Sequence, residues 1–92
     1  RKSVELLIGE RYYYLKNYDQ SYKHLKNLLN YDLDKRQYLG VLYRLAQMDV
    51  LNGATDLASK RFKKIAKLGN KLWIAKDSHE MSLKLDLEYN EA

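Results

Sequence analysis

Residues 8–28 read IGERYYYLKNYDQSYKHLKNL, and residues 45–65 read LAQMDVLNGATDLASKRFKKI. The two stretches carry one pattern ~37 residues apart, a spacing in the range of helical repeat arrays. Each opens with a large apolar residue followed by a small one, Ile8-Gly9 in the first and Leu45-Ala46 in the second. The later matching positions are Ser21 and Ala58, Leu25 and Phe62, and Leu28 and Ile65. The duplication predicts an all-α fold, and repeated helical units form interaction scaffolds more often than reaction chambers.

The chain has 92 residues, which is the size of one small domain. It begins with Arg1 and not with methionine, so we expect a segment of a longer protein. The absence of cysteine excludes disulfides and thiolate metal sites, and 46% hydrophobic residues suffice for an apolar core. No stretch approaches the ~18 apolar residues of a membrane span. We expect a single domain over residues 1–92 and a cytoplasmic location.

Apolar residues recur at the helical spacing i, i+3, i+4 along most of the chain. The pattern predicts helix pairs over about residues 3–31 and 35–68 and a capping helix over about 71–89. In the first helix the stripe expected to be buried is Val4, Leu7, Ile8, Arg11, Tyr12 and Leu15. The second is expected to bury Tyr22, Leu25, Leu28 and Leu29, and the third Tyr38, Leu39, Leu42, Leu45, Ala46 and Asp49. The fourth is expected to bury Ala58, Phe62, Ile65 and Leu68.

The helix ends carry their own signals. Asn17 tolerates the left-handed conformation that ends a helix, and Asp19 is suited to cap the next one. Asp34 is the expected cap of the third helix. Gly53 gives the clearest stop signal, because glycine adopts the left-handed conformation at little cost, and Gly69 ends the fourth helix in the same way.

The last segment carries two conflicting periods. Residues from Leu72 to Glu80 favour helix, but the apolar residues beyond them alternate with polar ones, which is a strand period. We expect a helix, because an isolated strand would have no partner in a helical chain. Trp73 or Ile74 and Met81 should then pack beside Phe62 and Ile65. The apolar positions left over, which continue the array or form a self-association surface, are Leu83, Leu87 and Tyr89.

The duplicated unit resembles the tetratricopeptide repeat family, in which each repeat is a pair of antiparallel helices. The resemblance covers about residues 3–68 and implies a right-handed array of about five helices. In the first copy the matching residues are Ile8-Gly9, Tyr12, Tyr18, Ser21, Leu25 and Leu28. In the second copy they are Leu42, Leu45-Ala46, Gly53, Ala58, Phe62 and Ile65, and Asp49 stands where the family has an aromatic residue. The alternative is an unrelated five-helix bundle.

The resemblance implies a concave face that binds a peptide or a helix of a partner protein. Tyr13 is expected on that face, with packing against a neighbouring helix as the alternative. The residues expected there are Leu6, Glu10, Tyr13, Tyr43, Gln47 and Val50. An alternative hypothesis is that the chain is the peptide-sensing segment of a bacterial transcription regulator. Only the sequence of the full-length gene would decide between the two.

A basic stripe is the most conspicuous charge feature in a chain of net charge +5. No acidic residue occurs between Asp56 and Asp77, and four lysines in this stretch share one side of the predicted helix. These are Lys60, Lys64, Lys67 and Lys71. They could attract nucleic acid, but no aromatic residue interleaves them to stack bases. The sequence therefore favours a solvated helix face and a protein partner over nucleic acid.

The sequence gives little indication of catalysis or of a metal site. His24 and His79 belong to different predicted helices, and adjacent helical residues such as Ser78-His79-Glu80 diverge too far for a catalytic triad. No phosphate-binding glycine loop or nucleophile motif occurs. We expect a non-enzymatic interaction module without a metal or a cofactor.

Overall fold

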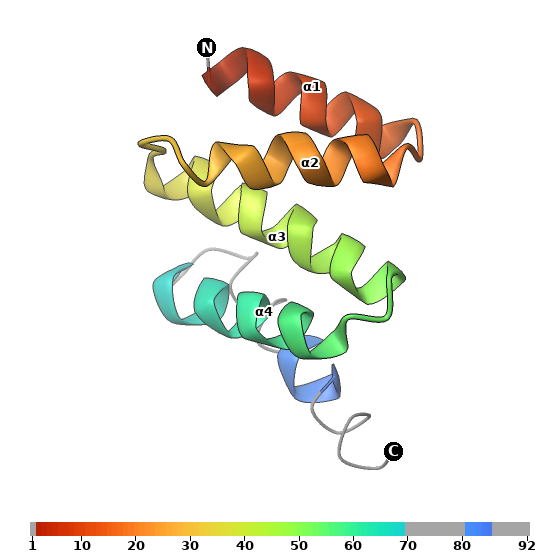
Figure 1. Ribbon diagram of the computed structural model, residues 1–92. Coiled ribbons are helices and arrows are strands. Elements are labelled where there is room, and N and C mark those ends of the chain that lie inside the picture. The colour runs from red at the N-terminus through yellow and green to blue at the C-terminus, as the bar shows by residue number, and fades with distance from the viewer. Residues whose placement is uncertain (1, 70–80, 86–92) are drawn as a thin grey trace. The chain divides into compact units, whose positions relative to one another are not determined.

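The computed structural model describes residues 2–69 and 81–85, and within them the secondary structure is helical throughout. The four helices are α1 (Lys2–Tyr14), α2 (Tyr18–Leu28), α3 (Lys35–Leu51) and α4 (Thr55–Gly69) (Figure 1). Residues 81–85 form a further helical segment, so helix and not strand is correct there. The rest of the predicted capping helix lies outside the described residues. The all-α prediction is confirmed.

The chain divides into two compact units, Arg1–Val41 and Leu42–Ala92. The first contains α1, α2 and residues 35–41 of α3, and the second contains residues 42–51 of α3, α4 and the segment 81–85. None of the helices in the described residues has both the length and the apolar character that crossing a membrane requires.

The connections α1–α2 and α3–α4 have the same backbone structure. Lys16 and Gly53, 37 positions apart, both adopt positive φ, at 62° and 77°. The N–H of each donates to the carbonyl three residues earlier, at 3.0 Å in both connections. The N–H of the following residue donates to the carbonyl five residues earlier, at 2.9 Å in the first and 2.8 Å in the second. The duplication seen in the sequence is therefore matched by the backbone of the two connections.

The first connection differs from the prediction by one or two residues. Lys16, and not Asn17, is the left-handed residue. Asn17 is instead the N-cap of α2, because its side-chain oxygen accepts from the backbone N–H of Gln20 at 3.5 Å. The prediction that Asp19 caps this helix is wrong: α2 has already begun at Tyr18. Because the left-handed residue lies one position earlier than expected, α2 and its N-cap also begin earlier.

The start of α3 is as predicted. The Asp34 carboxylate accepts from the backbone N–H of Gln37 at 2.8 Å. The Gln37 side-chain carbonyl accepts in return from the backbone N–H of Asp34 at 3.2 Å. This reciprocal pair is a capping box, which satisfies two backbone donors that the helix itself cannot.

In the first unit, α1 and α2 run antiparallel (Figure 1), and they approach each other closely at Gly9. A Cβ atom on Gly9 would lie 2.5 Å from Cδ2 of Leu25, whose side chain is fully buried. The Ser21 hydroxyl donates to the Gly9 carbonyl at 2.7 Å. The prediction that small residues allow this close approach is confirmed at Gly9 and Ser21.

The stripe predicted to be buried along α1 is wrong at four positions. Val4, Leu7 and Leu15 are 51%, 70% and 63% exposed, and Arg11 is exposed as well. With about 100° between successive residues, these positions lie roughly on the opposite side of the helix from Gly9. Because the Gly9 side of α1 packs against α2, Val4, Leu7 and Leu15 lie on the side of α1 that faces away from α2. On α2 itself, Leu25 and Leu28 are buried as expected, whereas Tyr22 and Leu29 are half-buried.

The core of the second unit follows the predicted pattern closely. Residues 42–51 of α3 and the helix α4 run antiparallel (Figure 1), and they bury the predicted apolar side chains. The buried residues are Leu42, Leu45, Ala46, Asp49, Ala58, Phe62 and Ile65. Leu68, also predicted to be buried, is 38% exposed because it lies beyond the face that carries Phe62 and Ile65.

The segment 81–85 supplies buried residues to this unit. Ser82 and Leu85 are buried, and the Ser82 hydroxyl lies 3.4 Å from that of Ser59 on α4. Met81 is half-buried, and Leu83 is exposed, as expected of a leftover apolar position. Trp73, Ile74, Leu87 and Tyr89 lie outside the described residues.

Candidate functional site

Three of the residues predicted to contact a partner belong to the first unit. Leu6, Glu10 and Tyr13, here called the first row, follow the spacing i, i+4, i+7 along α1. All three are half-buried. The first row therefore keeps part of an apolar side chain, a carboxylate and a phenol in contact with solvent.

The other three predicted contact residues belong to the second unit. Tyr43, Gln47 and Val50, here called the second row, have the same spacing on α3 and are also half-buried. Each lies 37 positions after its counterpart in the first row. The duplicated unit thus presents the same three helical positions twice, with the same degree of exposure.

Part of each row takes part in packing inside its own unit. The Tyr13 ring meets the Tyr18 ring edge-on at 5.5 Å. Tyr43 meets Phe62 in the same way at 5.8 Å. The Gln47 side-chain carbonyl accepts from Arg44 at 2.9 Å. These contacts fix the orientation of Tyr13, Tyr43 and Gln47, so substitutions in the rows must keep the two tyrosine rings if they are to test binding alone.

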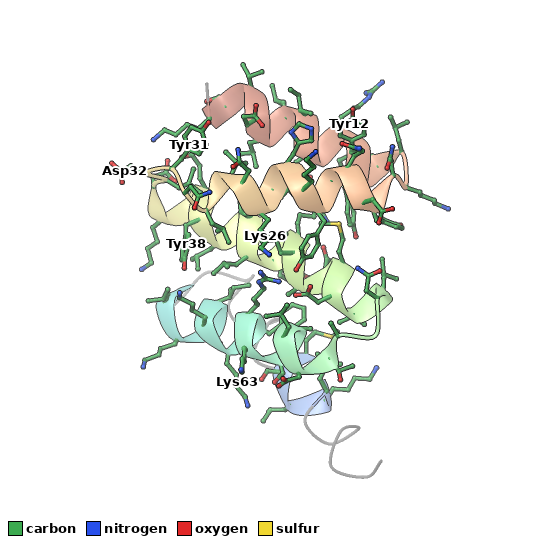
Figure 2. The ribbon with its side chains drawn as sticks, in the orientation of Figure 1. Tyr12, Lys26, Tyr31, Asp32, Tyr38 and Lys63 are labelled. Atoms are coloured by element: carbon green, nitrogen blue, oxygen red, sulfur yellow. The ribbon has the colours of Figure 1, made fainter. Side chains whose placement is uncertain are left out.

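A separate hollow of about 650 Å³ lies beside α2 in the first unit. At its edge His24 Nδ1 lies 3.1 Å from Glu5 Oε2, which ties α2 to α1. The Tyr12 ring stacks on the His24 imidazole, with centroids 5.5 Å apart and planes inclined by 19°, at the seam of the two helices (Figure 2). The residues that line the hollow are Glu5, Lys23, His24, Lys26, Asn27, Leu29 and Asn30.

The chemistry of the hollow suits polar ligands that carry hydrogen-bond acceptors. Lys23 and Asn27 are four residues apart on α2 and so neighbour each other on its surface, whereas Lys26 lies in its last turn and Asn30 in the turn that follows. All four side chains are exposed, and their ammonium and amide groups can donate to carboxylates or peptide carbonyls. The sequence analysis missed this patch, although the i, i+4 pair of Lys23 and Asn27 was a readable signal.

The basic stripe predicted on the fourth helix is present on α4. Lys60, Lys64 and Lys67 are exposed, and Phe62 and Ile65 are buried on the other side of the helix. Lys63 is also exposed and projects from the helix (Figure 2). Lys71, the fourth member of the predicted stripe, lies outside the described residues.

Within residues 2–69 and 81–85 the structure groups no three histidine, aspartate or glutamate side chains as metal ligands. Comparison of the chain with models of known protein families, with curated proteins and with solved structures gave no match. The assignment of function therefore depends on the geometry described above.

Proposed function

We propose that the chain is a non-enzymatic protein-interaction module of the tetratricopeptide type that binds a peptide or helix of a partner protein. The observation that supports this most is the repeated connection, with matching hydrogen bonds and matching positive φ at Lys16 and Gly53. Folds built from repeated helix pairs use their extended surfaces to bind other proteins. The proposed location is the cytoplasm.

Each of the two rows provides a proposed contact surface in its own unit. Leu6 and Val50 offer apolar contact, while Glu10 and Gln47 offer an acceptor and an amide to the backbone of a peptide. Tyr13 and Tyr43 are already held by ring contacts, so their hydroxyl groups are presented with little loss of side-chain entropy.

A display selection tests the proposal without knowledge of the natural partner. Random peptides would be selected on the immobilised chain, and the enriched sequence measured by fluorescence anisotropy. We expect binding to weaken by about tenfold or more in the variant Glu10→Ala/Gln47→Ala, as for the loss of central contacts. Gln20→Ala on the exposed side of α2 is the matched control. Failure to enrich any peptide, or equal binding by all three proteins, would contradict the proposal.

A second candidate function is supported by the exposed lysines of α4. Lys60, Lys64 and Lys67 lie on one side of the helix and could bind the phosphates of a nucleic acid. Three phosphate contacts would give a slope of roughly −2.7 in a plot of log K against log salt concentration for duplex DNA. Titration of labelled DNA and RNA at two salt concentrations measures this slope. If the affinity were unchanged after Lys60, Lys64 and Lys67 were all replaced by glutamine, nucleic-acid binding through these lysines would be excluded.

A further inference from the structure

The side of α1 that turns away from Gly9 is apolar and exposed. We call Val4, Leu7, Ile8, Arg11 and Leu15 the outer face of α1. Leu7 is the most exposed of its apolar members, at 70%, and Ile8 is half-buried. Apolar side chains gathered on one helix face mark an interaction site more reliably than single exposed ones.

The second copy of the repeat shows what this helix face does elsewhere in the same chain. The positions that match Val4, Ile8 and Arg11 are Val41, Leu45 and Met48. All three of those α3 side chains are 0% exposed. The other two positions, Leu7 and Leu15, match the half-buried Arg44 and the exposed Asn52. Three of the five positions of this face are thus fully buried in the second copy, whereas in the first copy the face is half-buried at Ile8 and exposed elsewhere.

The difference in chemistry between the copies indicates what would cover the open face. Arg11 occupies the position of the buried Met48. A guanidinium covered by a partner requires a carboxylate, because an unpaired buried charge is costly. The net charge of +5 also favours an acidic partner.

We propose that the outer face of α1 docks an acidic amphipathic helix of a partner protein. The apolar stripe of that helix would cover Val4, Leu7 and Leu15, and a glutamate or aspartate within the stripe would pair with Arg11. This surface is separate from the first row, which lies on another side of α1.

Two synthetic helical peptides test the proposal. Both carry leucines at heptad a and d positions; one has a glutamate at the centre of the stripe and the other a lysine. Fluorescence anisotropy with the whole chain should show at least about tenfold tighter binding of the glutamate peptide. Arg11→Glu should reverse this preference, and Leu7→Ser should weaken binding of the glutamate peptide by a similar factor.

Two control substitutions separate docking from general effects of charge and polarity. Arg36→Glu makes the same substitution at an exposed residue of α3, and Leu51→Ser makes the same change of polarity at an apolar residue that is 60% exposed. Both controls should bind like the unmodified chain. Because Arg11 and Leu7 are exposed, circular dichroism should show unchanged helicity in all variants.

Two results would overturn the proposal. One is weak or equal binding of the two peptides by the unmodified chain. The other is a dimer in sedimentation that Leu7→Ser dissociates, because the outer face would then belong to a second copy of the chain.

Discussion

Arg61 Nη1 lies 2.6 Å from Asp49 Oδ2, and the two side chains are only 13% and 3% exposed. In the first unit the matching positions are His24 and Tyr12, whose rings stack. The same contact between paired helices is therefore ionic in one copy of the repeat and aromatic in the other. Asp49 stands where the first unit has the aromatic residue Tyr12, and its partner Arg61 stands where the first unit has His24.

Loss of Arg61 should destabilise the fold strongly. Arg61→Met would leave the Asp49 carboxylate buried without its cation, which costs about 3 kcal/mol or more of unfolding free energy. Urea unfolding followed by circular dichroism measures the change. The double variant Asp49→Tyr/Arg61→His installs the aromatic pair of the first unit and should lose less stability than the two single variants together. Additive losses would show that the two contacts are not equivalent.

Two glycines should respond in opposite directions to alanine. Gly9→Ala should lower the free energy of unfolding by about 1 kcal/mol, because overpacking against Leu25 outweighs the gain in helix propensity. Gly40→Ala in α3 should raise it by about 1 kcal/mol, because no atom lies within 4 Å of the added Cβ. Thermal and urea unfolding compare the two. Stabilisation by Gly9→Ala would contradict the close approach of α1 and α2.

The matching left-handed residues predict a second opposed pair. Lys16→Gly should stabilise the chain by up to about 1 kcal/mol, since a non-glycine residue at φ 62° is disfavoured. Gly53→Ala at φ 77° should destabilise it by a similar amount. Equal signs for the two changes in urea unfolding would argue against equivalent connections.

Removal of the α3 cap should be measurable by itself. Asp34→Ala abolishes the 2.8 Å bond to the Gln37 N–H and should cost about 1 kcal/mol of unfolding free energy. Asp32→Ala is the control of equal charge, because Asp32 takes part in its hydrogen bond with Lys2 through the backbone carbonyl. If both variants melted at the same temperature, the capping box would have no energetic role.

Features that depend on neighbouring residues were predictable from the sequence. Asp34 is followed three residues later by Gln37, and Gly53 follows an apolar helical run, so both ends of α3 were placed correctly. The small residues Gly9 and Ser21 were also interpreted correctly, because the comparison of the two copies singled them out. Local chemistry and internal duplication were sufficient for these features.

Features that depend on the choice between competing contacts were not predictable. α1 has apolar residues on more than one side, and the contact of Gly9 with Leu25 decides which side is buried. The ion pair of Asp49 with Arg61 joins residues on different helices, so no helical period reveals it. The hollow lined by Lys23 and Asn27 likewise exists only once α1 lies beside α2.

Mapping a bound peptide by NMR tests the interaction-module proposal most directly. A peptide from the display selection would be titrated into the ¹⁵N-labelled chain and the shifts of the backbone amides followed. The proposal predicts the largest shifts at the first and second rows, led by Glu10, Tyr13 and Gln47. Shifts confined to the lysines of α4, or spread evenly over both units, would contradict it.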